Sequence, residues 1–89
     1  MTELQQKFIK YSTLIKTTLT KRPTDDELLK LYALFKQANF GDNTTKKPNF
    51  LDIKENAKWN RWKSLHGKSK IYSMKKYIKL VKILQEKYS

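Results

Sequence analysis

Apolar residues recur at three- and four-residue steps in several separate segments of this chain, and no segment alternates long enough to predict a β-strand. The first segment advances by four, three and four residues, through Leu4, Phe8, Tyr11 and Ile15. The last has the same kind of spacing, through Met74, Tyr77, Val81, Leu84 and Tyr88. These stripes predict helices over residues 3–18 and about 69–87, each with one apolar face.

Two further helices are predicted from their start and stop signals. Pro23 breaks the chain, and Thr24 with Glu27 forms a capping box that starts a second helix. This helix should end near Asn39, because Gly41 can adopt the left-handed conformation that closes a helix. The polar residues up to 49 then indicate a surface loop.

A third, short helix is predicted to begin at Asp52, which can cap it, with Glu55 three residues later. It runs through both tryptophans and stops at Gly67. The four segments together predict an all-α fold, a four-helix bundle.

The second helix carries apolar residues on more than one side and therefore needs two partners. One stripe, which can face a protein core, comprises Leu31, Leu34, Phe35 and Ala38. A second stripe lies roughly 100° around the axis and comprises Leu28 or Leu29, Tyr32 and Lys36. Because it mixes apolar side chains with a phenol and a cation, this stripe suits an amphiphile with an apolar body and an anionic head.

Length and charge narrow the kind of protein. A chain of 89 residues predicts one domain, residues 1–89, with little room for an enclosed catalytic cleft. Its 20 Lys and Arg against 8 Asp and Glu give a formal charge of +12, which makes this a basic protein and favours an anionic partner.

Composition also bears on location. The chain has no cysteine, which excludes disulfides and thiolate metal sites and fits a reducing compartment. Residues 1–10 lack the apolar core of a signal peptide, and no apolar run is long enough for a membrane-spanning helix. We therefore expect a cytoplasmic protein.

The parts of an enzyme are missing from the sequence. His66 is the one histidine, no thiol exists, and most carboxylates are accounted for as helix starts. Neither a nucleophile with its base nor a metal cluster can be assembled from what remains. We expect no enzyme activity, no cofactor and no metal site, and we interpret His66 as a solvated residue near a helix end.

A cluster that could hold a phosphate is suggested by three residues. Lys36 lies one turn after Tyr32, and Lys58 lies on the third helix. If the second and third helices pack together, two ammonium groups and a phenolic hydroxyl converge on one anion. The alternative is that both lysines are ordinary solvated residues and Tyr32 belongs to the core.

The other aromatic residues are open to two interpretations as well. Trp59, Trp62 and Tyr77 are by default core residues, because each lies on an apolar stripe or three residues from another aromatic. Each could instead offer an edge or a face to a flat ligand such as a base.

The motifs LLKLYALFKQANFGD, LDIKENAKWNRWKSLHGKSK and MKKYIKLV resemble those of the acyl-CoA-binding protein family, a small four-helix module. The resemblance covers residues 23–88, and the first helix aligns more loosely through Phe8. It implies an up-down bundle shaped as a bowl, with the CoA head group on a polar rim and the acyl chain in a groove near the second and third helices.

The resemblance also implies roles for particular residues. Tyr32, Lys36 and Lys58 match the residues that hold the ribose 3′-phosphate, and Tyr77 matches the tyrosine beside the adenine. Phe35 stands where many members have a second tyrosine, so stacking survives without the hydroxyl. The remaining matches are the apolar groove positions Leu28 and Leu29 and the lysines near the nucleotide, Lys16 and Lys54.

The function that follows is non-covalent binding of long-chain fatty acyl-CoA, with carrier and pool-forming roles in lipid metabolism. Expected partners are acyl-CoA, the enzymes that use it and anionic membrane surfaces, and the protein is expected to be a monomer. A nucleic-acid-binding module is the main alternative, because lysine-rich helices near aromatics can neutralise phosphates and stack bases. A membrane contact through the basic last helix, without a ligand pocket, is another.

Overall fold

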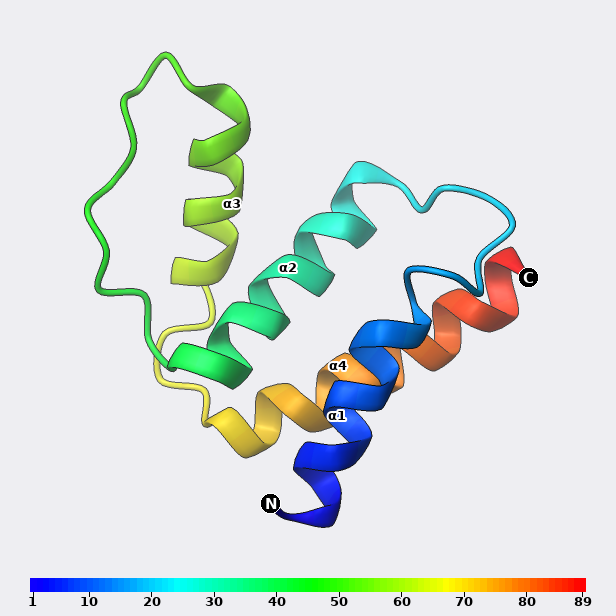
Figure 1. The fold of residues 1–89 in the computed structure, drawn as a ribbon. Coiled ribbons are helices and arrows are strands. Elements are labelled where there is room, and N and C mark those ends of the chain that lie inside the picture. Colours follow the sequence, from blue (N-terminus) through cyan, green and yellow to red (C-terminus); the bar gives the residue numbers. More distant parts are fainter.

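Four helices form close to the positions that the apolar spacing predicts, in a computed structural model that describes residues 1–89 (Figure 1). No strand is present. The helices are α1 (Glu3–Leu14), α2 (Asp25–Phe40), α3 (Ile53–Lys63) and α4 (Lys70–Tyr88). None of them is both long and apolar enough to cross a membrane.

The predicted helix starts are confirmed by their caps. The Thr24 side chain accepts a hydrogen bond from the Glu27 N–H, and the Glu27 carboxylate accepts one from the Thr24 N–H. Asp52 caps α3 and Ser69 caps α4 through one hydrogen bond each, which the side chain accepts from the N–H three residues later. Gly41, which closes α2, has a φ of 78°, in the region that favours glycine.

Two predicted helix ends are wrong. The first helix ends at Leu14 rather than at residue 18, because the Thr18 hydroxyl also bonds to the Leu14 carbonyl and Thr20 is held by the Tyr88 carbonyl at the far end of the chain. α3 ends at Lys63 rather than at Gly67, since the following residues form tight turns with three-residue hydrogen bonds.

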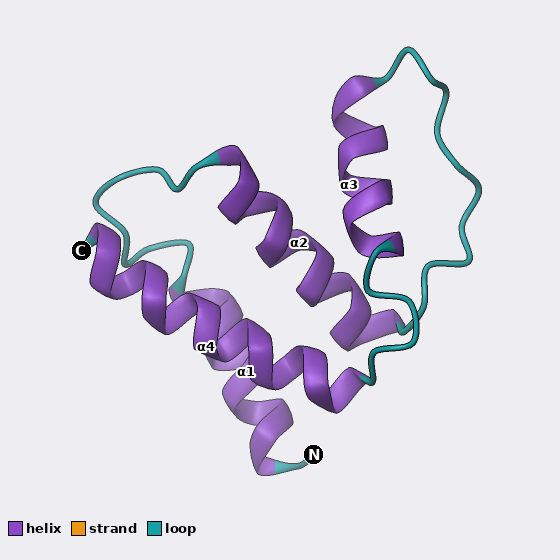
Figure 2. Ribbon diagram, turned by 180° about the vertical axis from the view of Figure 1, so that it is seen from behind, coloured by secondary structure: helices purple, strands orange, loops and turns teal.

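The helices form a shallow bowl rather than a closed bundle. α2 packs against both α4 and α3, α1 packs against α4, and α3 packs against α2 alone. Figures 1 and 2 show α3 standing beside α2, away from α1 and α4. The molecule is accordingly flat, with extents of 35 × 31 × 15 Å.

The core lies between α4 and the facing sides of α1 and α2. Its buried apolar members are Phe8, Leu31, Ala38, Met74, Tyr77, Ile78, Val81 and Leu84. The stripe predicted on α2 is only partly correct, because Phe35 is 38% exposed and Leu34 is half-buried. Ala33 and Gln37 are buried instead, since α2 is covered by α4 on one side and by α3 on another.

A buried polar cluster holds the end of α3 on α2. The Trp62 indole N–H donates to the Gln37 Oε1 at 3.1 Å and to the Gly41 carbonyl at 2.9 Å. The Gln37 Nε2 in turn donates to the Lys68 carbonyl at 2.8 Å and to Asp42 at 2.9 Å. Gln37 is completely buried, and both ends of its amide are satisfied.

Glu27 joins the start of α2 to the end of α4. Its carboxylate accepts hydrogen bonds from the Tyr88 hydroxyl at 2.5 Å and from the Lys87 ammonium at 2.9 Å. These bonds, the Tyr88 bond first, lower the pKa of Glu27 from 4.5 to about 2.

We predict that this carboxylate contributes to acid unfolding. Because its pKa is lower in the folded state, its contribution to stability is present above pH 4.5 and is lost as the pH falls towards 2. Glu27→Gln should therefore be less stable than the parent at pH 7 and lose less further stability on acidification. Urea unfolding at pH 7 and at about pH 3 measures this. Glu86→Gln, which changes an exposed carboxylate on α4, is the control; an unchanged acid dependence in Glu27→Gln would contradict the assignment.

Candidate functional site

Two lysines from different helices approach the same tyrosine ring. Lys36 of α2 has its Nζ 5.8 Å from the centre of the Tyr32 ring, and Lys58 of α3 has its Nζ 5.5 Å from that centre. Lys58 is also 3.7 Å from the Glu55 carboxylate, but its side chain remains 43% exposed. The packing of α2 against α3 thus brings together the three residues that the sequence predicted to converge.

A first cleft opens beside this cluster, between the beginnings of α2 and α3. It has a volume of about 450 Å³ and an apolar floor with charged residues around it. The lining residues are Arg22, Asp25, Leu28, Leu29, Tyr32, Ile53, Lys54, Ala57 and Lys58.

A second cleft of about 330 Å³ lies between the end of α1, α2 and α4. Its lining residues are Ser12, Ile15, Lys16, Leu31, Tyr32, Phe35 and Tyr77. Tyr32 lines both clefts, so the two adjoin at its ring. An elongated ligand could therefore occupy both clefts and contact Lys36 and Lys58 where the clefts adjoin.

The second cleft has an aromatic wall. The ring centres of Phe35 and Tyr77 are 6.1 Å apart, and the buried Phe8 ring meets Tyr77 edge-on with its centre 5.1 Å away. Burial raises the pKa of Tyr77 to about 12, so the phenol stays neutral at physiological pH. Such a wall can contact a flat aromatic group without adding a charge.

The predicted site residues are brought together on one side of α2. All of them line one of the two clefts except Lys36, which lies over the Tyr32 ring next to both. Three residues that line the first cleft, Arg22, Ile53 and Ala57, were not predicted as site residues from the sequence. Ile53 and Ala57 are four residues apart and each precedes a predicted lysine, which could have marked that helix face; Arg22 lies outside any helix and has no such signal.

The tryptophans and the histidine lie outside these clefts. Trp62 is buried, as predicted by default, whereas Trp59 is only half-buried and donates to the Thr45 carbonyl at 3.1 Å. The His66 side chain is 64% exposed, with its Nδ1 3.5 Å from Asp42. It is therefore a solvated residue near a helix end, as interpreted from the sequence.

Cations outnumber carboxylates around the two clefts. The cations are Lys16, Arg22, Lys36, Lys54 and Lys58, and the carboxylates near them are Asp25, 2.9 Å from Arg22, and Glu55. Positive charge beside an apolar floor and an aromatic wall can bind an anionic, partly aromatic molecule with an apolar tail.

Comparisons with known proteins point to the same kind of molecule. The family model described as "Acyl CoA binding protein" matches residues 5–81. An acyl-CoA-binding protein homolog of Drosophila melanogaster is 54% identical over 72 residues, which covers 81% of this chain and 84% of the relative. Acyl-CoA-binding protein homolog 1 of Caenorhabditis elegans is 52% identical over 71 residues, covering 80% and 83%. A crystal structure of acyl-CoA-binding protein 2 from Oryza sativa is 39% identical, covers 94% of this chain and 92% of that one, and has a TM-score of 0.89.

Proposed function

Because this chain belongs to the acyl-CoA-binding protein family, we propose that it binds long-chain fatty acyl-CoA esters non-covalently and serves as their carrier and pool in lipid metabolism. In this proposal residues 1–89 form one acyl-CoA-binding domain that breaks no bond. The observation that carries it is the pair of clefts that share Tyr32, one with an apolar floor and one with an aromatic wall.

In this proposal the CoA head group lies against the lysine pair at Tyr32 and extends into the second cleft. The ribose 3′-phosphate lies against Lys36, Lys58 and the Tyr32 hydroxyl, because a phosphate accepts several charge-assisted hydrogen bonds at once. The adenine lies beside Tyr77, with Phe35 completing the aromatic wall. Lys16 and Lys54, on opposite sides, add positive charge for the remaining phosphates.

The acyl chain occupies the first cleft. Leu28 and Leu29 form its floor on α2, and Ile53 and Ala57 form its wall on α3. Each fully buried methylene contributes about 0.8 kcal/mol, so a sixteen-carbon chain could contribute on the order of 10 kcal/mol before ordering costs. The cleft is open, so the chain is buried in part, and affinity rises with chain length.

The proposal extends to location and partners. The protein acts as a monomer in the cytoplasm, which the absence of cysteine fits. It transfers its cargo to acyl-CoA-using enzymes and to anionic membranes, which the charge of +12 favours. Resident cofactors and metals have no part in it.

Calorimetry with palmitoyl-CoA, octanoyl-CoA and palmitate tests the proposal. Palmitoyl-CoA should bind tightest, octanoyl-CoA more weakly, and palmitate at least about tenfold more weakly than palmitoyl-CoA, since a carboxylate cannot satisfy two lysines and a tyrosine arranged around a phosphate. Equal affinity for palmitate and palmitoyl-CoA would show that the cluster does not recognise the head group. Equal affinity for the two thioesters would remove the acyl groove from the proposal.

A further inference from the structure

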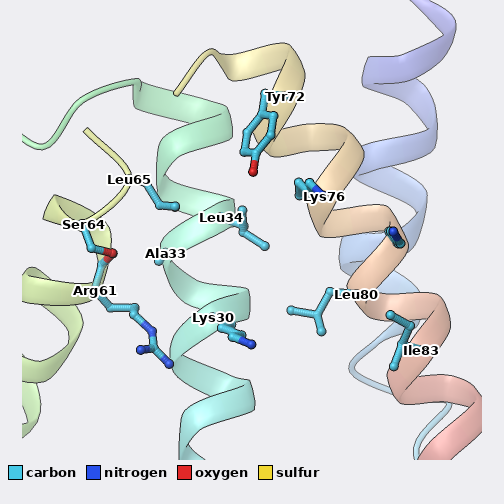
Figure 3. A pocket seen from close by; sticks show the side chains of 11 residues that line it. Lys30, Ala33, Leu34, Arg61, Ser64, Leu65, Tyr72, Lys76, Leu80 and Ile83 are labelled. Atoms are coloured by element: carbon cyan, nitrogen blue, oxygen red, sulfur yellow. The ribbon is translucent and has the colours of Figure 1, made fainter. Parts of the chain in front are cut away.

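A third cleft lies on the other side of α2, between the end of α3 and α4, and none of the proposed acyl-CoA contacts lines it. Its volume is about 490 Å³, similar to that of the acyl groove. Figure 3 shows Leu34 of α2 and Leu80 of α4 pointing into the gap between the two helices. Ile83, which continues this floor, is 48% exposed, so a sizeable apolar surface is left open to solvent.

Cations surround that apolar floor, and no carboxylate lines the cleft. Figure 3 shows Lys30 on the α2 side and Lys76 on α4. Lys79, also on α4, lines the same cleft. None of these three lysines forms an ion pair. Arg61, from α3, is the one cation of the cleft that is paired, with Asp26. An occupant should therefore be apolar on one side and acidic along its edges.

The arrangement of the helices indicates the shape of the occupant. α3 and α4 both pack on α2 but not on each other, as their separation in Figure 2 shows, and the third cleft lies on α2 between them. The α4 wall runs from Tyr72 to Ile83, about 16 Å at 1.5 Å per residue, which matches roughly three helical turns. A flat bilayer would contact the lysines at the rim but would not reach Leu34 and Leu80 on the floor.

We infer that this cleft, the back groove, binds an acidic amphipathic helix of a partner protein, which packs its apolar stripe on Leu34, Leu80 and Ile83 and its carboxylates against Lys30, Lys76 and Lys79. This site lies apart from the two clefts proposed for acyl-CoA, so a partner can bind while the cargo is held. It gives the carrier a surface for recognising a protein.

The test uses a labelled synthetic peptide of about sixteen residues, built from leucine, alanine and glutamate, with the leucines at three- and four-residue steps. Fluorescence anisotropy should show binding to the full chain with equal affinity in the presence and absence of saturating palmitoyl-CoA. A peptide of the same composition with its leucines spread around the helix should bind at least about tenfold more weakly.

Matched charge reversals on α4 locate the contact. Lys76→Glu with Lys79→Glu should weaken peptide binding by about tenfold or more, whereas Lys75→Glu with Lys82→Glu, which makes the same change in net charge outside the back groove, should weaken it by less than about threefold. Palmitoyl-CoA binding should be unchanged in the first pair, which also shows that it folds.

Three results would overturn the inference. If both pairs of lysine reversals weakened peptide binding equally, the attraction would come from net charge alone. If the two peptides bound equally well, the apolar floor would not take part in binding. Absence of peptide binding would overturn it as well. If vesicles containing anionic lipid then bound through Lys76 and Lys79, the groove would be a membrane contact instead.

Discussion

Replacing both Lys36 and Lys58 with alanine is expected to weaken palmitoyl-CoA binding by roughly a hundredfold, about 3 kcal/mol. Each lysine is proposed to make a charge-assisted hydrogen bond to the 3′-phosphate, and the two approach the Tyr32 ring from different helices. Isothermal calorimetry of the double variant measures the change in affinity, and each single variant should lose part of it.

The stability of the same double variant separates binding from folding. Lys58 is 43% exposed and its one ion pair, with Glu55, is a surface pair, so its loss should cost the fold little. Urea unfolding should change by less than about 1 kcal/mol. Lys10→Ala with Lys75→Ala removes the same charge from exposed positions outside all three clefts and should leave affinity within about threefold. Parent-like affinity in the Lys36 and Lys58 double variant would remove the phosphate contact from the proposed site.

Replacing Gln37 with alanine is expected to lower the free energy of unfolding by about 3 kcal/mol. The change removes a fully buried amide, leaves the Lys68 carbonyl without its partner and opens a cavity beside Trp62. Asp42 loses one hydrogen bond and keeps the one from the Gly67 N–H. Urea unfolding followed by tryptophan fluorescence measures the loss, because Trp62 reports on the same cluster. Gln6→Ala, on the exposed side of α1, should change stability by less than about 0.5 kcal/mol.

A second substitution at the same position tests the hydrogen bonds rather than the volume. Gln37→Glu keeps the shape but turns the Nε2 donor into an oxygen that faces the Lys68 carbonyl and the Asp42 carboxylate. At neutral pH it should destabilise the fold at least as much as alanine does, since a buried carboxylate would face the Lys68 carbonyl and the partly exposed Asp42 carboxylate without a donor between them. A glutamate variant as stable as the parent would show that packing, not donation from Nε2, holds α3 on α2.

The order and type of the helices could be predicted because they depend on local features. A threonine or aspartate with an acidic residue three positions later marks a helix start by satisfying free N–H groups, and this signal located α2 and α3. The end of α1 was misplaced because it depends in part on a partner far along the chain, whereas tight local turns end α3 at Lys63 and a distant carboxylate holds Gly67 beyond them. Thr20 bonds to the Tyr88 carbonyl, and Gly67 donates to Asp42.

Most residues of the proposed acyl-CoA site could also be predicted from the sequence. The resemblance named its residues, and the stripe of Leu28, Tyr32 and Lys36 on one helix face gave an independent reason for most of the α2 contribution. Arg22 could not be predicted, because no periodicity constrains a residue in a connecting segment. Phe35 was predicted for both the core and the site, and its partial exposure at the second cleft fits the site.

Local sequence alone was enough to specify four amphipathic helices, their caps and a surplus of positive charge, since these properties follow from residues within a few positions of one another. The tertiary structure decided which faces of α2 are covered by other helices. α3 packs on α2 without reaching α4, so one side of α2 joins Lys36 and Lys58 at Tyr32 while another leaves the back groove open. Which face of α2 each neighbouring helix covers depends on packing between segments that are distant in the sequence. The spacing of apolar residues within one helix does not specify those neighbours.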